Sequence, residues 1–449
     1  MSDKGLSPGT RVAVLCKPSS DAIACMLAIL RIGCIYVPLD VRLPQGRHLA
    51  MIDTCTPGLL LCHSDTYDIG LQLQSSCKSN INISDISKLS HVEGEEEVKN
   101  LARPTEPAFL LFTSGTTGVP KGILLSQANF VNNLALKTEE LAIGREIVLQ
   151  QSSLGFDMSI VQTFCALANG GTLVVAPRES RGDPVELSKL MLREGVTFTI
   201  ATPSEYLMML RYGIEFLKKH TSWRQVCMGG EAVTQQLVRA FQSLERPNVR
   251  LTNCYGPTEI TAAATFQNIP LTSDNTGTSN GQNLVGKALP NYSVYIVDDN
   301  CQPLPIGSAG EICIGGAGVA LGYLDPEQTK SKFLPDPHAT AEDIAKGWST
   351  MYRTGDKGRL LPDGTLVFLG RIDGDSQVKI RGLRIELDDV ANTILKAGSG
   401  LISDAVVTVR GDPAFLSLRL CLRLERAWMR PNCSSSPKTS HCRSTWFHR

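Results

Sequence analysis

The chain has 449 residues, 42% of them hydrophobic, and its 44 basic residues balance 44 acidic ones. This length exceeds the usual size of one folding unit, so we expect at least two. Without net charge there is no global field to attract nucleic acid or an anionic membrane, and we expect neither as a partner. Residues 22–30 form the longest apolar stretch near the start, which is too short to cross a bilayer, and residues 1–9 lack a signal-peptide core. A cytoplasmic location, with the 14 scattered cysteines reduced, is therefore expected.

The first 175 residues alternate between strand-like and helix-like patterns. Short apolar runs predict strands at residues 12–15, 35–40, 58–62, 109–112 and 171–175. Apolar residues at helical spacing predict helices at residues 21–33 and 129–141. This alternation favours an α/β fold with parallel-rich sheets. We interpret the polar residues 64–106 as a variable surface region and residues 272–281 as a loop.

After Pro290 the pattern changes to shorter units. Strands are predicted at residues 293–297, 310–314, 359–361 and 365–369, which favours a small antiparallel subdomain. A linker at 370–375, a strand at 377–380 and a helix at 387–395 predict the start of a small, truncated α+β C-terminal domain. We therefore predict a large N-terminal domain over residues 1–370, the start of a small domain over 371–411, and a basic tail over 412–449 that does not resemble a folded domain.

Residues 110–122, here called the phosphate loop, combine glycines, hydroxyls and a lysine directly after a strand-like run. Glycines let backbone N–H groups converge on an anion, hydroxyls add donors, and a lysine adds a mobile positive charge. The candidate residues are Thr113, Ser114, Gly115, Thr116, Thr117, Gly118 and Lys121. Their spacing differs from that of a Walker A loop. The run predicts a polyphosphate-binding loop of another kind, with a simple surface turn as the alternative.

Eight blocks of the sequence occur in the order that one family uses. They are residues 30–40, the phosphate loop, 156–159 (Phe-Asp-Met-Ser), 229–232 (Gly-Gly-Glu-Ala), 253–259 (Asn-Cys-Tyr-Gly-Pro-Thr-Glu), 310–324, 352–356 (Tyr-Arg-Thr-Gly-Asp) and 370–387. With these blocks the chain resembles the adenylate-forming superfamily, most closely the adenylation domains of nonribosomal peptide synthetases. Residues 178–187 and 374–377 resemble those of fungal polyketide–peptide hybrid synthetases.

The resemblance implies an amino-acid adenylating ligase of secondary-metabolite biosynthesis. Such a protein converts an amino acid and ATP to aminoacyl-AMP and pyrophosphate, then loads the phosphopantetheine of a carrier protein, here supplied in trans. ATP and Mg²⁺ are the implied cofactors. The implied catalytic residues are Lys121, Thr258, Glu259, Arg371 and Lys379, with Thr258 on the α-phosphate and Glu259 also the metal ligand. The implied nucleotide contacts are Tyr255 on adenine, Gly230 and Glu231 at the purine edge, and Asp356 on the ribose hydroxyls.

Asp157 is implied to bind the α-ammonium of the amino acid, a charge that is costly to bury without a partner. An alternative interpretation is a helix N-cap, because Asp157 precedes an apolar run. The remaining implied pocket residues are Met158, Val161, Ala201, Cys227, Gly229, Cys254, Ala262 and Ala263. They are small or apolar, which predicts a roomy pocket for an aliphatic or aromatic side chain. Asp373 matches the hinge about which the family's small domain rotates.

Two departures from the family pattern affect the expected activity. The sequence lacks the family's first block, so we expect an exposed sheet edge, and it lacks a late Asn-Gly-Lys block whose lysine holds the substrate carboxylate. Loss of one such contact costs on the order of 10² to 10³ in rate. The leading hypothesis is an adenylation domain with reduced or partner-dependent activity. The alternatives are a catalytically inactive remnant that still binds nucleotide or partners, and an acyl-CoA ligase, which Asp157 disfavours.

Overall fold

A computed structural model describes residues 6–88, 99–113, 120–246, 248–271, 283–372, 377–380, 383–398, 401–410 and 415–422. The chain divides into two compact units. The large unit comprises residues 1–113 and 120–372, and the small unit includes the described residues from Gln377 onward. In the described residues, no helix is long and apolar enough to cross a membrane.

The N-terminal part of the large unit is a seven-stranded sheet. Its strands are β1 (Arg11–Leu15), β2 (Ile35–Pro38), β3 (Leu59–Cys62), β4 (Asn82–Asp85), β5 (Pro107–Thr113), β6 (Lys121–Ser126) and β16 (Gly322–Tyr323), in the order β16-β6-β5-β2-β1-β3-β4. Neighbours from β5 to β4 are parallel, whereas β6 pairs antiparallel with β5 and with β16. Thr113 and Lys121 face each other in that register, so the two ends of the phosphate loop are brought together.

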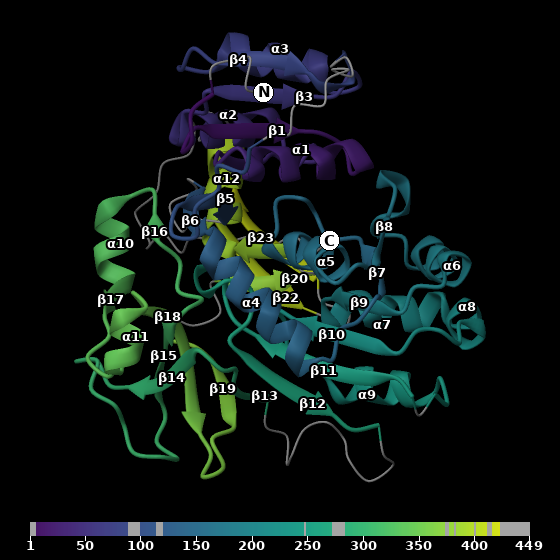
Figure 1. The fold of residues 1–449 in the computed structure, drawn as a ribbon, viewed down its shortest axis with the longest axis vertical. Helices are drawn as coiled ribbons and strands as arrows, with labels where there is room; N and C mark the ends of the chain where they lie inside the picture. Colours follow the sequence, from purple (N-terminus) through teal and green to yellow (C-terminus); the bar gives the residue numbers. More distant parts are fainter. Residues whose placement is uncertain are drawn as a thin grey trace, which may run out of the picture. The chain divides into compact units, whose positions relative to one another are not determined.

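Helices cover both faces of this sheet, as its fully buried strands β2 and β3 require. Helix α1 (Ser20–Arg31) packs on one face with Val12 and Val14, while α2 (Gln45–Cys55) and α3 (Tyr67–Ser76) pack on the other with Ala13 and Leu15 (Figure 1). Alternate residues of a strand point to opposite faces, which explains this division. The Ser19 side chain caps α1 by accepting a hydrogen bond from the Ala22 amide.

The second sheet of the large unit has twelve strands. They are β7 (Ile147–Gln150), β8 (Thr172–Val175), β9 (Phe198–Ala201), β10 (Gln225–Gly229), β11 (Arg250–Tyr255), β12 (Thr265–Ile269), β13 (Asn283–Ala288), β14 (Tyr292–Val297), β15 (Gly310–Gly316), β17 (Phe333–Pro335), β18 (Thr350–Leu360) and β19 (Leu366–Arg371). Strands β8-β7-β9-β10-β11 are parallel, and the strands beyond β11 pair antiparallel. The predicted antiparallel strands therefore exist, but they continue the parallel sheet instead of forming one of their own, because β13 pairs with both β12 and β19.

The helices of this second part lie on the two faces of the parallel strands. They are α4 (Gln127–Glu140), α5 (Asp157–Leu167), α6 (Pro184–Glu194), α7 (Pro203–Tyr212), α8 (Ile214–Lys219) and α9 (Gln235–Gln242), followed later by α10 (Pro326–Lys332) and α11 (Ala341–Ala345). Short 3₁₀ turns occur at η2 (Ile86–Lys88), η3 (Arg178–Ser180) and η4 (Thr258–Ile260). Residues of α4 and α5 join one hydrophobic cluster with Phe198 and Ile200, whereas residues of α6, α7 and α9 join another with Ala201.

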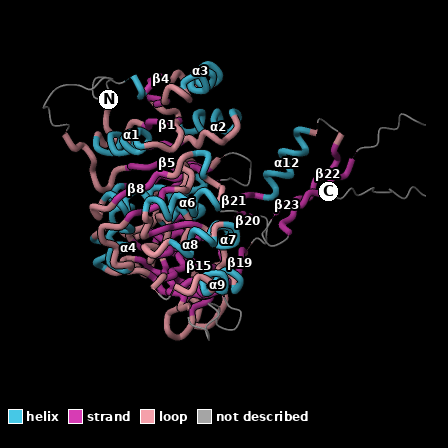
Figure 2. Tube along the Cα trace, turned by 90° about the vertical axis from the view of Figure 1, so that its right-hand side faces the viewer, coloured by secondary structure: helices cyan, strands magenta, loops and turns pink. Residues whose placement is uncertain are grey.

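The small unit contains β20 (Gln377–Ile380) paired antiparallel with β21 (Leu383–Glu386), helix α12 (Leu387–Ala397), and β22 (Ile402–Arg410) paired antiparallel with β23 (Phe415–Leu422) (Figure 2). Helix α12 packs against β22. An α+β character was predicted for this part, and the fold class of the whole chain is confirmed.

Four sequence expectations either differ from the structure or fall on residues that it does not describe. The polar residues 64–106 include α3 and β4, so this region adds an edge strand to the seven-stranded sheet. The tail expected to lack a folded domain includes β23. The β4 segment Asn-Ile-Ser-Asp is polar and becomes a strand by pairing with β3. The β23 segment Phe-Leu-Ser-Leu-Arg-Leu-Cys-Leu is largely apolar, and it pairs with β22 although the tail as a whole is basic. The loop at 272–281 and the hinge residue Asp373 lie outside the described residues.

Candidate functional site

Asp356 is a buried carboxylate held between two strands and an aromatic residue. It lies in β18 opposite Arg371 of β19. Its Oδ1 accepts a hydrogen bond from Arg371 Nη1 at 2.8 Å, and its Oδ2 accepts one from the Tyr255 hydroxyl at 2.7 Å. Arg371 Nη1 also donates to the Thr354 carbonyl oxygen at 2.9 Å, which fixes the guanidinium. Each carboxylate oxygen has two lone pairs, so Asp356 can still accept from two hydroxyls of a ligand.

Tyr255 ends β11 and contacts this carboxylate with its polar tip. Burial, together with the charge of Asp356, raises the pKa of Tyr255 well above its ordinary value, so its hydroxyl remains a donor. Its ring packs against Phe368 with a centroid distance of 5.9 Å. Gly230, directly after β10, has φ +87°, a left-handed conformation that suits glycine. Glu231 accepts hydrogen bonds from the backbone amide and the hydroxyl of Ser204 at the start of α7.

Glu259 lies in η4, directly after Thr258, and is fully buried. Its Oε1 accepts a hydrogen bond from the Tyr323 hydroxyl at 2.9 Å, and that hydroxyl lies 3.1 Å from the Tyr352 hydroxyl. A single hard carboxylate of this kind fits Mg²⁺, which commonly takes one or two protein carboxylates plus phosphate oxygens and water. Within the described ranges, no group of three His, Cys, Asp or Glu side chains could hold a metal by itself.

The phosphate loop is described only at its two ends. Lys121 begins β6 and Thr113 ends β5. The Thr113 hydroxyl is buried, and within the described chain it has no hydrogen-bond partner. Ser114, Gly115, Thr116, Thr117 and Gly118 lie outside the described residues.

Asp157 is the first residue of α5, and Phe156 occupies the N-cap position without a side-chain cap. The carboxylate of Asp157 accepts a hydrogen bond from the Met158 amide at 2.7 Å. The N-cap residue is therefore Phe156, and the interpretation of Asp157 as the N-cap is wrong. Met158 packs at the edge of the same hydrophobic cluster that contains Val161.

The parallel strands bring most of the predicted pocket residues to one region. In the register of β10 with β11, Gly229 lies opposite Cys254. A Cβ at Gly229 would lie 2.7 Å from the Cys254 carbonyl oxygen, so only glycine fits there. One hydrophobic cluster includes Cys227 and Val161, and Cys254 and Ala262 pack against it. Ala263, which follows Ala262 in the chain, is buried.

The structure separates Ala201 from this set. Ala201 belongs to the cluster on the opposite face of the sheet, with residues of α6, α7 and α9. Its neighbour Ile200, 7% exposed, shares the cluster of Cys227 and Val161 instead. The period of two along β9 causes this, since a shift of one residue moves a side chain to the other face. Ile200 was not among the predicted pocket residues, although strict alternation counted from Phe198 places it on the face of Phe198.

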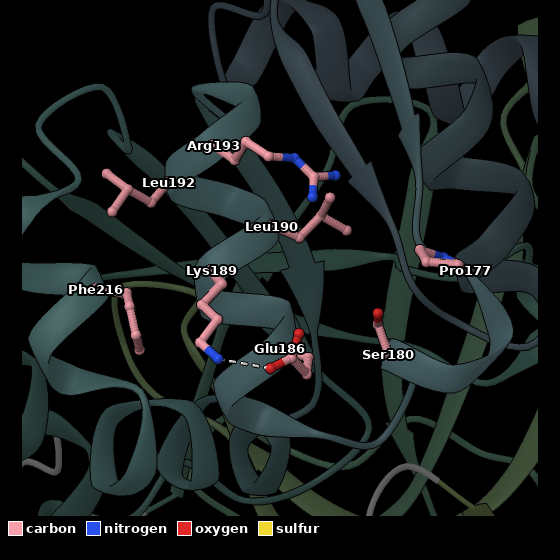
Figure 3. A pocket seen from close by; sticks show the side chains of 8 residues that line it. All are labelled: Pro177, Ser180, Glu186, Lys189, Leu190, Leu192, Arg193 and Phe216. Atoms are coloured by element: carbon pink, nitrogen blue, oxygen red, sulfur yellow. Dashed lines mark hydrogen bonds and ion pairs between the residues drawn. The ribbon is translucent and has the colours of Figure 1, made fainter.

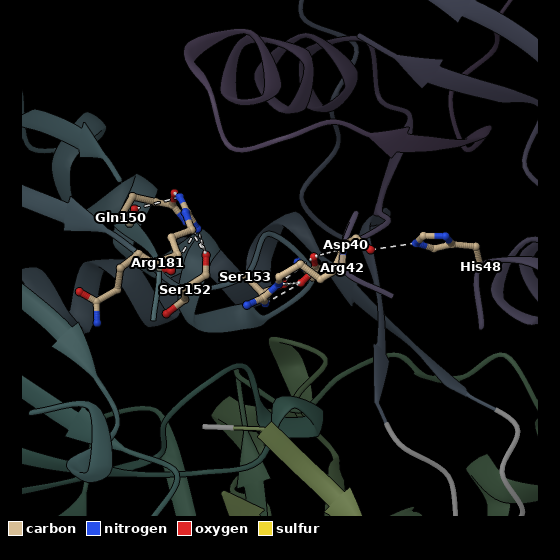
Figure 4. A network of polar contacts seen from close by, with 9 residues as sticks. Asp40, Arg42, His48, Gln150, Ser152, Ser153 and Arg181 are labelled. Atoms are coloured by element: carbon tan, nitrogen blue, oxygen red, sulfur yellow. Dashed lines mark hydrogen bonds and ion pairs between the residues drawn. The ribbon is translucent and has the colours of Figure 1, made fainter. Parts of the chain in front are cut away.

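A polar network fixes the chain segment before α5 (Figure 4). Arg181 donates to the carbonyl oxygens of Gln151 at 3.0 Å, Ser152 at 2.6 Å and Ala176 at 2.8 Å, and burial lowers its pKa to about 10. Asp40, after β2, accepts from Arg42 at 2.7 Å and from the Ser153 hydroxyl. Asp40 and Arg181 lie in sequence blocks that resemble the family, but no role was predicted for either residue.

A surface cavity of about 390 Å³ lies against α6, α8 and η3 (Figure 3). Its lining consists of Pro177, Ser180, Glu186, Lys189, Leu190, Leu192, Arg193 and Phe216. None of these is a predicted site residue. Lys379, by contrast, lies in β20 of the small unit, in register with Arg384.

Comparison with known proteins adds to this geometry. A family model described as AMP-binding enzyme matches residues 1–324. The chain is 59% identical over 414 residues to the hybrid PKS-NRPS synthetase apdA of Emericella nidulans, and 52% identical over 424 residues to the tenellin synthetase of Beauveria bassiana. These alignments cover 90% and 91% of this chain but 10% of each relative, so the chain spans about a tenth of the length of these curated relatives.

Solved structures give the same result for the fold. The crystal structure of IdnL1 is similar, with a TM-score of 0.76 at 26% identity, over 96% of this chain and 84% of that one. A crystal structure of the nonribosomal peptide synthetase FmoA3 has a TM-score of 0.71 at 27% identity, over 82% of this chain and 38% of that one. Fold and sequence together define an adenylation domain of the kind found in nonribosomal peptide synthetases. The chain belongs to the AMP-binding enzyme family, and the predicted resemblance to fungal hybrid synthetases is confirmed.

Proposed function

We propose that the chain activates an amino acid with ATP. In this reaction a carboxylate oxygen of the amino acid attacks the α-phosphorus of ATP, and pyrophosphate leaves as the aminoacyl-AMP forms. The single observation that carries the proposal is the arrangement of Tyr255, Asp356 and Arg371, which orients a buried carboxylate as an acceptor for ribose hydroxyls. FmoA3, to which this chain is 27% and 26% identical, has been solved in an AMPPNP-bound form and in a form bound to α-methyl-L-serine-AMP.

The other site residues have proposed roles that follow from their chemistry. Glu259 would hold Mg²⁺, which supplies charge stabilisation to the phosphates when bound. Lys121 and the Thr113 hydroxyl provide a cation and a donor at the ends of the phosphate loop. Asp157, at the start of α5, would accept the α-ammonium of the substrate. The activated amino acid would then load a phosphopantetheine carrier in trans; a solved relative with 24% identity is itself an artificial fusion of an adenylation domain with a PCP.

Amino-acid-dependent exchange of pyrophosphate into ATP tests the proposal on the purified 449-residue chain. We expect exchange with one or a few amino acids from a panel, and a loss of about 10²-fold or more in the double variant Lys121→Ala, Glu259→Ala. Glu327→Ala is the matched control, because this glutamate is exposed and belongs to α10. Absence of exchange from folded protein that still binds ATP would instead support the inactive remnant.

A further inference from the structure

Lys137, near the end of α4, is a lysine buried in the protein interior. Lys137 is only 4% exposed to solvent. Its Nζ donates to the side-chain oxygen of Asn133 and lies over the Phe266 ring at 5.7 Å from the centroid. Asn133 is itself fixed, since its Nδ2 donates to the Ala263 carbonyl oxygen at 2.9 Å and contacts the Tyr292 hydroxyl at 3.0 Å. The ammonium is therefore held in one place by a defined network.

This ammonium lies beside the predicted amino-acid pocket. Burial lowers the pKa of Lys137. Four nearby groups act to raise this pKa: Cys254, Cys165, Cys227 and Asp157. Three of those four groups were predicted to line the pocket on independent grounds. A fourth pocket residue, Ala263, is joined to Lys137 through Asn133. The lysine thus reaches the pocket from α4, an element that carries none of the predicted pocket residues.

The ammonium has unused capacity to donate hydrogen bonds. Lysine has three N–H donors, and in the described residues the Asn133 oxygen is the one acceptor of Lys137. The Phe266 ring and the thiols of Cys254, Cys165 and Cys227 lie near the ammonium, together with the carboxylate of Asp157. An apolar residue of similar length would fill this space without the desolvation cost of a buried charge. A substrate atom that accepts a hydrogen bond would supply the missing partner.

We propose that Lys137 is a specificity-determining residue, whose ammonium donates to an oxygen at the far end of the substrate's side chain. The inference rests on the proposed adenylation function and names its substrate class: an amino acid with a largely apolar side chain that ends in an oxygen acceptor. The Phe266 ring and the apolar lining favour a hydroxyaryl side chain over a flexible carboxylate. Tyrosine, phenylalanine and glutamate are therefore the informative probes.

Exchange assays with these three amino acids give the first test. We expect the wild-type chain to prefer tyrosine over phenylalanine by about 10²-fold or more in kcat/KM, because a buried donor left without its acceptor penalises the analogue. Lys137→Met should reduce that ratio to about 10-fold or less while exchange with phenylalanine is retained. Lys189→Met is the matched control, since Lys189 also lies over an aromatic ring, at 5.5 Å from Phe216, but is 47% exposed at the surface. It should leave the ratio unchanged.

Direct binding separates this inference from the proposed function. Calorimetry would measure the affinity of both proteins for the 5′-O-sulfamoyladenosine derivatives of tyrosine, phenylalanine and glutamate, which need no turnover. A preference for the tyrosyl derivative that Lys137→Met abolishes supports the role of Lys137. If exchange is absent at the same time, the proposed adenylation activity is rejected but the role of Lys137 is not. A glutamyl preference lost in the variant keeps the role but identifies a carboxylate. Equal affinities, or a preference that Lys137→Met leaves intact, would show a structural lysine and overturn the inference.

Discussion

At the scale of single residues, the site depends on how a few carboxylates are oriented. Asp356 is held by Arg371 on one oxygen and by Tyr255 on the other, at 2.8 and 2.7 Å. Because both partners are donors, the carboxylate stays an acceptor and presents its remaining lone pairs to a ligand. Glu259 is likewise held by the Tyr323 hydroxyl. Tyr255 lies on β11 and Asp356 on β18, 101 residues apart in the sequence, so their hydrogen bond requires that the antiparallel strands continue the parallel sheet.

Asp356→Asn should weaken ATP binding by about 10- to 100-fold, which corresponds to the loss of hydrogen bonds to a charged group. Titration calorimetry with ATP and with adenosine measures this. Adenosine carries the ribose without phosphates, so Asp356→Asn should weaken both ligands, whereas Lys121→Ala should weaken ATP alone. If Asp356→Asn left adenosine affinity unchanged, Asp356 would not bind the ribose.

At the scale of elements, the start of α5 is positioned from a distance. The loop after β7 is held by Arg181, which donates to its carbonyl oxygens, and by Asp40, which accepts from Ser153 in that loop and from Arg42 (Figure 4). Asp40 follows β2 of the seven-stranded sheet, whereas Ser153 follows β7 of the twelve-stranded sheet. This contact therefore links the two sheets next to Asp157, the residue proposed to bind the substrate's ammonium.

The Asp40 contact predicts a pH-dependent stability. Burial alone would raise the pKa of Asp40, but hydrogen bonds from Arg42 and Ser153 outweigh it and lower the pKa below its ordinary 3.8. A lowered carboxyl pKa stabilises the fold above pH 3.8, and this stabilisation is lost as the pH falls through the folded-state pKa.

Asp40→Asn should therefore cost about 1–3 kcal/mol in the free energy of unfolding near neutral pH, and progressively less below about pH 4. Urea unfolding of both proteins across this range measures the difference. Asp299→Asn, at an exposed turn, is the control and should have no such effect. A cost that stayed constant down to about pH 3 would contradict the ionic contribution of Asp40.

At the scale of the whole molecule, the large unit contains its own core. The buried members of all four hydrophobic clusters found in the described residues fall between Val12 and Leu366. The proposed nucleotide contacts Tyr255 and Asp356 and the proposed Mg²⁺ ligand Glu259 belong to the same unit. The small unit contributes Lys379, on β20, to the predicted catalytic set. Binding of the nucleotide and completion of the reaction are therefore expected to depend on different parts of the chain.

A chain ended after Ile372 should retain cooperative unfolding, with a Tm within about 3 °C of the full chain, because its core is intact. ATP affinity should change less than about 3-fold, while exchange should fall by 10²-fold or more, on the order expected for one lost charged catalytic contact. Scanning calorimetry, ATP titration and exchange on both proteins check this. A non-cooperative transition or lost ATP binding in the shorter chain would mean that the large unit does not stand alone.

The sequence by itself determined the family, the fold class and most elements, because these depend on local patterns: buried apolar runs for β2 and β3, a glycine-rich phosphate loop, and motif blocks in a fixed order. It also predicted Tyr255, Glu259 and Asp356, which the motifs contain, as site residues. Only the tertiary structure decided which side chains share a face or a partner. Ala201 and Ile200 point to opposite faces because side chains alternate along β9. The packing of α4 against the sheet buries Lys137, whose local sequence resembles any exposed helix. Burial and long-range hydrogen bonding are properties of the assembled sheets, so no local pattern records them.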